Sequence, residues 1–276
     1  MGINFDLAGK VYDTVRTTPT AAQIEAYARA AGDDNPRYAA GPRQVAPPVF
    51  AVVPAFPSLI GGPVADPDLG LDDPLAILHG EQAFVFHRPL RPGEELTLAP
   101  ALERVEDKGR HALFVTRVAI GHRGEPVADL AATIVVRGGG SGRPRPPSEP
   151  TAPAVDRRHR FDVASRVDED LPPRYAAASG DHNPIHLDDG VARAVGLPGR
   201  INHGLGTLAL VAGPLLDRLA GGDPERLRAM RVRFTGMVFP GDDLTTSVWS
   251  GAAVEFETRR DDGSTVMSGT MEVEGG

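Results

Sequence analysis

The sequence predicts an α+β protein made by tandem duplication, in which each half is one long apolar helix wrapped by an antiparallel β-sheet. The first observation is that residues 27–38, YARAAGDDNPRY, return as residues 175–186, YAAASGDHNPIH, at an offset of 148 (175 − 27). The second is that RPGEEL at 91–96 returns as FPGDDL at 239–244 with the same offset. The third is the order within each half, where an apolar run precedes several short alternating segments. Self-similarity at a fixed spacing indicates two copies of one structural unit.

In the first half, residues 1–137, a threonine start and a glycine stop predict a capped helix over 20–32. Residues 48–60 are apolar, but Pro54 and Pro57 predict a shortened or kinked central helix. Alternating segments bounded by turn residues then predict antiparallel strands at 83–87, 96–101, 112–120 and 127–136. The first half is therefore expected to be a degenerate copy.

Residues 138–153 are rich in Gly, Pro and Ser and predict a linker. In the second half, residues 154–276, we expect short helices at 172–179 and 188–195 and a buried helix that begins at Gly204. Residues 205–216 contain no ionisable side chain, as a core helix requires. Strands are expected at 230–238, 244–249, 254–258 and 265–273. Two such units should join edge to edge, because pairing hides their exposed strands.

The composition excludes several classes of protein. A chain of 276 residues with 41% hydrophobic content suits two globular domains. The net charge of −8 argues against nucleic acid or an anionic membrane surface as a partner. The absence of cysteine excludes disulfides and thiolate chemistry, and is compatible with the cytoplasmic location that we expect. The start has no targeting pattern, and the longest apolar run is expected to be too short for a membrane span.

The segment Gly180-Asp-His-Asn-Pro-Ile-His186, with Gly204 eighteen residues further on, resembles the signature of the MaoC-like (R)-specific enoyl-CoA hydratases, also called hydratase 2. Those enzymes have the hot-dog fold. The duplication, with His-Gly-Glu-Gln at 79–82, resembles the double-hot-dog members, and the likeness covers nearly the whole chain. It implies hydration of trans-2-enoyl-CoA to (R)-3-hydroxyacyl-CoA by a homodimer, without cofactor or metal.

The resemblance assigns Asp181 and His186 to the activation of water and to proton transfer. It assigns Asn183 to orientation and the Gly204 N–H to the thioester oxygen. The residue types suit the reaction, which needs a base, an acid and a hydrogen-bond donor for the developing charge. A helix start supplies such a donor, since its first N–H groups have no partner within the helix.

A purely structural role is also open for two of these residues. Asp181 can close a turn, and Asn183 can cap a helix whose first residue is Pro184. The first half keeps the equivalent Asp33, Asn35 and Pro36, but Tyr38 replaces His186. The glycine that would face Gly204 is expected to be lost within 49–56. The first half is therefore expected to be inactive, and its shortened helix to leave room for a long or bulky acyl chain.

Tyr175, His203 and Arg200 are further candidates for substrate binding. Tyr175 belongs to the family motif, but Tyr27 repeats it, which favours packing. His203 either faces the rim of the site or caps the helix, and Arg200 can bind phosphates of CoA or of a carrier protein. A zinc site at His182 and His186 is not expected, because the Asn-Pro between them breaks the helix that their spacing needs.

Two other functions stay open. The same fold can act on carrier-protein-bound chains as a 3-hydroxyacyl dehydratase of fatty-acid or polyketide synthesis, and the mild acidity of the chain only weakly favours free CoA esters. The chain could also be a non-catalytic acyl-thioester-binding or scaffold subunit. An intact set of acid–base residues argues against the latter, because binding alone needs no base.

Overall fold

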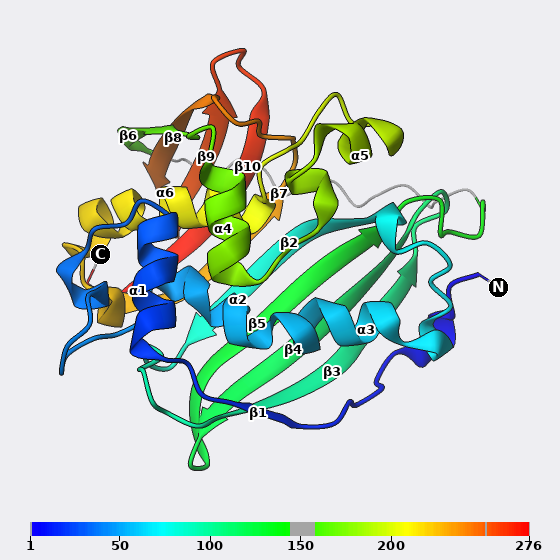
Figure 1. Ribbon diagram of the computed structural model, residues 1–276, viewed down its shortest axis with the longest axis horizontal. Helices are drawn as coiled ribbons and strands as arrows, with labels where there is room; N and C mark the ends of the chain where they lie inside the picture. The colour runs from blue at the N-terminus through cyan, green and yellow to red at the C-terminus, as the bar shows by residue number, and fades with distance from the viewer. Residues whose placement is uncertain (1, 144–157, 252, 276) are drawn as a thin grey trace.

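The computed structural model describes residues 2–143, 158–251 and 253–275. Within these residues ten strands form one sheet in the order β1-β3-β4-β5-β2-β7-β10-β9-β8-β6. The strands of the first half fill one side of this sheet and those of the second half fill the other (Figure 1). The predicted tandem α+β architecture is confirmed. Most of the predicted linker lies outside the described residues.

Each half repeats the same order of elements. The main elements of the first half are β1 (Val15–Thr17), α1 (Ala21–Ala30), β2 (Ile77–Phe86), β3 (Leu96–Asp107), β4 (Ala112–His122) and β5 (Glu125–Val136). Those of the second half are β6 (Arg158–Arg166), α4 (Leu171–Ser179), α5 (Asp189–Ala194), α6 (Gly204–Ala220), β7 (Leu227–Phe234), β8 (Asp243–Ser250), β9 (Val254–Arg260) and β10 (Thr265–Val273). The edge strands β1 and β6 were not predicted, because both are polar and contain no buried residue.

The two halves are joined in the middle of the sheet, where β2 pairs antiparallel with β7. The register runs from Glu81 opposite Arg233 to Val85 opposite Ala229. This pairing satisfies backbone groups that an isolated half would leave exposed at its edge. The expected edge-to-edge junction is therefore confirmed.

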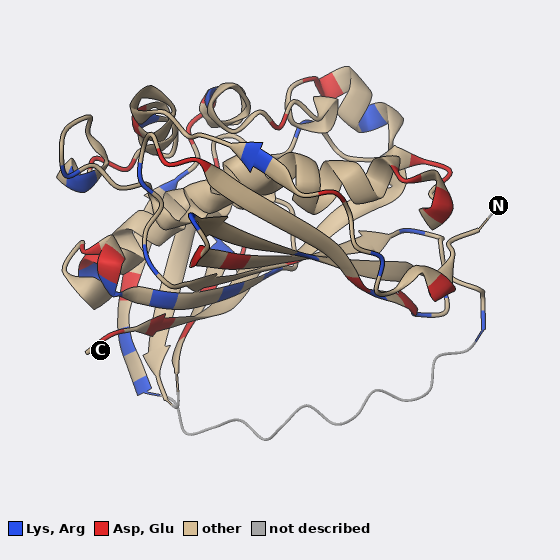
Figure 2. Ribbon diagram, turned by 90° about the horizontal axis from the view of Figure 1, so that it is seen from below, with Lys and Arg blue, Asp and Glu red and all other residues tan. Residues whose placement is uncertain are grey.

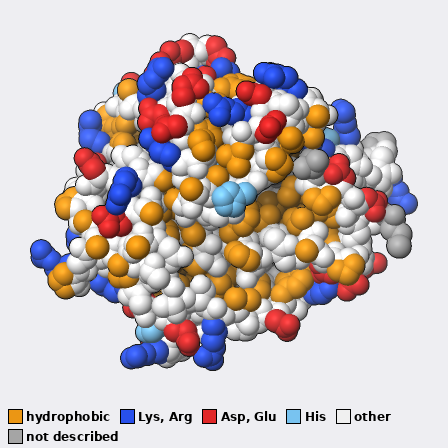
Figure 3. Space-filling model, viewed as in Figure 1, with side chains coloured by type: hydrophobic (Ala, Val, Ile, Leu, Met, Phe, Trp, Pro, Cys, Tyr) orange, Lys and Arg blue, Asp and Glu red, His pale blue; other side chains and the backbone are white. Residues whose placement is uncertain are grey.

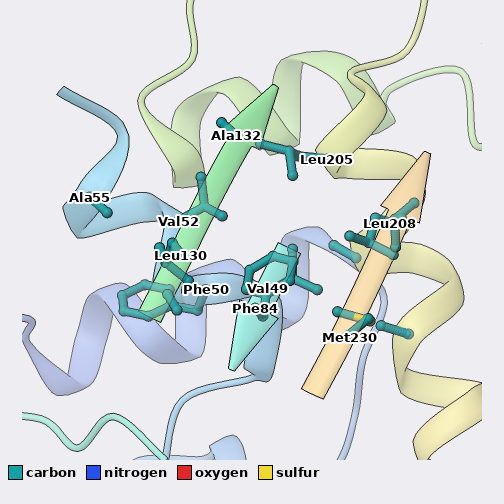
Figure 4. Packing of buried hydrophobic residues seen from close by; sticks show 14 of the residues in the cluster. Val49, Phe50, Val52, Ala55, Phe84, Leu130, Ala132, Leu205, Leu208 and Met230 are labelled. Atoms are coloured by element: carbon teal, nitrogen blue, oxygen red, sulfur yellow. The ribbon is translucent and has the colours of Figure 1, made fainter. Parts of the chain in front are cut away.

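The helices lie together on one side of the sheet (Figure 2). Leu205 and Leu208 of α6 belong to the same buried cluster as Val49 and Phe50 of the first half (Figure 4). One continuous hydrophobic core therefore spans both halves and fixes the two central helices relative to each other.

The central helix of the first half is not shortened, contrary to expectation. It continues from Pro48 to Ala65, and its parts are the 3₁₀ turn η3 (Pro48–Ala51), α2 (Val52–Phe56), the π turn η4 (Pro57–Gly61) and α3 (Gly62–Ala65). Proline removes a backbone donor, and here the chain adapts by changing the hydrogen-bond spacing instead of ending the helix.

The same helix also corrects the expectation about membrane spans. Pro48–Ala65 is 18 residues long with a mean hydropathy of 1.6, so its length and composition would suffice to cross a membrane. Half of these residues are buried inside the protein, as in a core helix packed on a sheet.

Leu208→Ala should lower the free energy of unfolding by about 2–5 kcal/mol, because Leu208 is fully buried between α6 and the sheet. Chemical denaturation followed by circular dichroism measures this loss. Leu210→Ala, at a partly exposed position of the same helix, is the matched control and should cost clearly less. Equal losses in the two variants would contradict the assignment of the buried face.

Candidate active site

Asp181 and His186 lie on the turn that follows α4. The helix ends at Gly180, whose φ of 79° is a left-handed conformation that glycine adopts without strain. The Asp181 carboxylate accepts the N–H of Asn183 at 3.2 Å, and the Asn183 side chain in turn caps the 3₁₀ helix η7 (Pro184–His186). These local hydrogen bonds hold Asp181 and His186 at a fixed spacing.

The hydrogen bonding of His186 prepares it to act as a base. Its Nδ1 lies 2.9 Å from the carbonyl oxygen of Ile201, which can only accept, so Nδ1 carries the proton and Nε2 keeps its lone pair. The side chain is 8% exposed. Burial lowers the pKa of His186 below 6.5, and the charge of Asp181 only partly opposes this effect. The imidazole is therefore neutral at pH 7.

His203 and Tyr175 lie behind this pair. The His203 ring stacks on the His186 ring with 3.9 Å between centroids, and its Nε2–H donates to the backbone carbonyl of Asp181 at 3.0 Å. Burial lowers the pKa of His203 to about 3. The Tyr175 ring lies 5.0 Å from His203, and its hydroxyl meets that of Tyr27 at 3.4 Å. At 1% and 2% exposed, His203 and Tyr175 are better placed to position the catalytic pair than to make the predicted contact with substrate.

Gly204 is the first residue of α6, so its N–H has no carbonyl within the helix to bond. A Cβ atom at this position would lie 3.2 Å from the ring of Phe234, which leaves little room for any side chain. Glycine therefore allows the Phe234 ring to pack directly on the backbone beside this amide, which lies at the positive end of the helix dipole.

Asp181, His186 and His203 each place a possible metal-ligating atom within 4.8 Å of the other two. The two imidazole rings are stacked, with 32° between their planes, and are not arranged around a common point. A tetrahedral ion needs lone pairs that converge on one point. The arrangement is therefore better suited to proton transfer than to metal binding.

Arg200 lies on the loop before α6, where its guanidinium is 3.8 Å from the carboxylate of Glu169. The side chain is 31% exposed, so it remains accessible from solvent. Its role in binding phosphate stays a prediction, as do the catalytic roles of Asp181, Asn183, His186 and Gly204.

The first half makes the same turn but has no histidine at the position of His186. The Asp33 carboxylate accepts the N–H of Asn35 at 3.2 Å, as Asp181 accepts that of Asn183. Tyr38 then occupies the place of His186, at the end of the equivalent 3₁₀ helix. The hydrogen bonds that Asp181 and Asn183 make in the turn are therefore not specific to a catalytic site.

The counterpart of Gly204 is Pro48, one residue before the expected 49–56. Each is the first residue of its helix, and the preceding residues have matching backbone angles: φ −53° and ψ 142° at Pro47, φ −59° and ψ 134° at His203. Proline has no N–H, so the first half cannot offer a hydrogen bond at this place.

Two residues that the sequence analysis did not assign to the site lie beside Gly204. One is Phe234, whose ring covers the Gly204 backbone, and the other is His79, whose ring lies 5.2 Å from that of Phe234. No local pattern marks Phe234. For His79 the available signal was Gly80, because a glycine inside a strand often indicates a bulge.

Both halves match known protein families. Residues 150–270 match the MaoC like domain, and residues 6–130 match the FAS1-like dehydratase domain region. The 3-hydroxyacyl-thioester dehydratase Y of Mycobacterium tuberculosis is 36% identical over 213 residues, which cover 73% of this chain and 70% of the relative. The peroxisomal enoyl-CoA hydratase 2 of Arabidopsis thaliana is 30% identical over 247 residues, 82% and 79% of the two chains.

A solved structure has the same fold over its whole length. The MaoC-like dehydratase from Phytophthora capsici superposes with a TM-score of 0.81 at 25% identity, covering 99% of this chain and all of the other. The double-hot-dog fold expected from the sequence is confirmed. The chain belongs to the MaoC-like dehydratase family.

Proposed function

We propose that this protein is a hydro-lyase that adds water to trans-2-enoyl thioesters to give (R)-3-hydroxyacyl thioesters, and that removes water in the reverse direction. The observation that carries this proposal is that side-chain atoms of Asp181 and His186 lie within 4.8 Å of each other, and that α6 begins at Gly204, directly after His203, whose ring stacks on that of His186. Relatives named enoyl-CoA hydratase and 3-hydroxyacyl-thioester dehydratase support both directions.

The geometry gives each group a step in the reaction. Water lies between Asp181 and His186, which take one proton as the oxygen bonds to carbon 3 of the enoyl group. Electron density moves to the thioester oxygen, where the Gly204 N–H and the helix dipole stabilise the developing charge. The proton held by the Asp181–His186 pair then goes to carbon 2, which restores the thioester carbonyl. The water molecule is consumed completely, so no other reactant is required.

The acyl group is proposed to lie on the helix of the first half. Figure 3 shows an apolar hollow near the middle of the helix-covered face, with a histidine at its edge. Val53, Phe56 and Val64 of the first half's helix are only partly buried, so they can contact an acyl chain. The room for substrate therefore comes from this hollow, since the helix itself is not shortened.

The match of the first half to a FAS1-like dehydratase region also supports a second candidate, the dehydration of carrier-bound 3-hydroxyacyl chains. The two candidates share the chemistry and differ in the carrier. The turnover of one acyl group on CoA and on an acyl carrier protein distinguishes them. The homodimer and the cytoplasmic location stay predictions.

Asp181→Asn and His186→Ala should each lower kcat for the hydration of crotonyl-CoA by about 10²–10⁴-fold, because general acid–base catalysis contributes an effect of that size. The loss of enone absorbance measures the rate. Asp33→Asn is the matched control, since it changes the equivalent aspartate of the first half, and it should keep the parent rate. An active Asp181→Asn variant would show that the proposed site is wrong.

Gly204→Pro should lower kcat by about 10²–10³-fold, because it removes the N–H that receives the thioester oxygen. Proline is well tolerated at the first position of a helix, and Pro48 shows that this fold accepts it there. Gly204→Ala keeps the N–H and adds a similar steric conflict with Phe234, so it separates the two effects. If both variants lost the same activity, the conflict with Phe234 would explain the result and the amide would have no special role.

The acid limb of kcat/KM should have its midpoint below pH 6.5, because burial lowers the pKa of His186 and only the neutral ring accepts a proton. A pH–rate profile with crotonyl-CoA measures it. The melting temperature should be followed in parallel. The pKa of this histidine is lower in the folded state than in the unfolded state. The folded protein is therefore most stable above pH 6.5 and loses stability as the pH falls from 6.5 toward the pKa of the folded state. If the midpoint of the acid limb lay above pH 6.5 while the melting temperature stayed constant over that pH range, His186 would not be the base.

A further inference from the structure

A β-bulge at Gly80 turns His79 of the first half toward the active site. On β5, Ile134 lies opposite His79 and the adjacent Thr133 lies opposite Glu81, so Gly80 is an extra residue in β2. Residues opposite each other share a face of the sheet, and Ile134 is buried, so His79 faces the helices. Without the bulge His79 would share the outer face with Glu81, because side chains two residues apart in a strand point the same way.

A side chain on Gly80 would be crowded at the bulge. A Cβ atom on Gly80 would lie 3.1 Å from the side chain of Val135 and 3.3 Å from the carbonyl oxygen of Thr133. Both distances are shorter than ordinary van der Waals contact. The inward direction of His79 is therefore encoded by the glycine that follows it.

His79 contacts the second half through Phe234, the last residue of β7. Their ring centroids are 5.2 Å apart with an angle of 66° between the planes, which is an edge-to-face contact. The Phe234 ring also lies 3.2–3.4 Å from the position that a Gly204 Cβ would occupy. Phe234 is thus held between His79 and the backbone at which the thioester oxygen is proposed to bind.

The histidine at this position leaves one of its two ring nitrogens unpaired among the described residues. The Nε2 atom of His79 is buried and has no hydrogen-bond partner in the part of the chain that the structure describes. An unpaired buried polar atom typically costs about 1–3 kcal/mol, which an aliphatic side chain would avoid. Burial lowers the pKa of His79 to about 4, although the charge of Asp181 is close enough to oppose the shift. The neutral ring therefore stands near the catalytic carboxylate.

We propose that His79 is a positioning residue of the active site, which holds Phe234 against Gly204 and thereby shapes the groove in which the thioester carbonyl meets the Gly204 amide. The active site is then shared by both halves: the second half supplies the reacting groups, and the inactive first half supplies a wall. The inference rests on the proposed hydration reaction.

The test uses the full chain with His79→Leu, Phe234→Leu and the double variant. Kcat and KM for crotonyl-CoA and the melting temperature are measured for each. His79→Leu should keep or raise the melting temperature but lower kcat about 10–100-fold, with a smaller change in KM, because the oxyanion site is displaced. The double variant should be no slower than Phe234→Leu, since His79 acts through Phe234.

His87→Leu is the matched control, because His87 directly follows β2 and pairs with Asp129 in an exposed position. It should keep the parent kcat. Parent-like kcat in His79→Leu, or losses that multiply in the double variant, would overturn the inference. If His79→Leu does not fold, His79→Gln replaces it in the test, and the same decrease in kcat is expected. A parent enzyme without hydratase activity would instead refute the proposed function.

Discussion

The antiparallel pairing of β2 with β7 is the interaction on which the rest of the structure depends. It converts two sheets into one, and it places both central helices on the same side of that sheet over a single core. It also brings the end of β7, with Phe234, next to the beginning of β2, with His79. Without this junction each half would expose a strand edge, and no residue of the first half would reach the site.

Duplication produced two copies of the turn but only one set of reactive groups. Both aspartates accept a backbone N–H, and both asparagines cap a short 3₁₀ helix, so selection for folding alone would keep these residues. The two halves differ at two other places, where Tyr38 stands for the histidine and Pro48 stands for the glycine. Under the proposed mechanism, the first difference would remove the base and the second would remove the amide donor.

The electrostatics of the two halves also differ. Burial raises the pKa of Asp33 to about 6, and its carboxylate lies so close to α6 that a side chain at Gly213 would collide with it. In the second half, burial instead keeps the imidazoles of His186 and His203 neutral. The same desolvation therefore disfavours the charged form of a carboxyl group in one half and of two imidazoles in the other.

The sequence by itself determined the duplication, the repeated turn, the start of α6 and most of the inner strands. These features depend on neighbouring residues: a cap, a glycine stop, a proline after asparagine, or an alternation of apolar side chains. The candidate set Asp181, Asn183, His186 and Gly204 could be named because these residues form a motif that resembles a known family signature, and the structure places them on one turn and one helix start.

Only the tertiary structure decided that the central helix of the first half continues through its prolines, and that Pro48 is the counterpart of Gly204. It also decided that His203 stacks on His186 and that His79 faces inward. Each of these facts depends on packing or on strand register between segments far apart in the chain. A one-residue bulge reverses the face of a strand residue, and the surrounding core can hold a helix together where local preference would end it. Such effects arise from contacts that no local pattern contains.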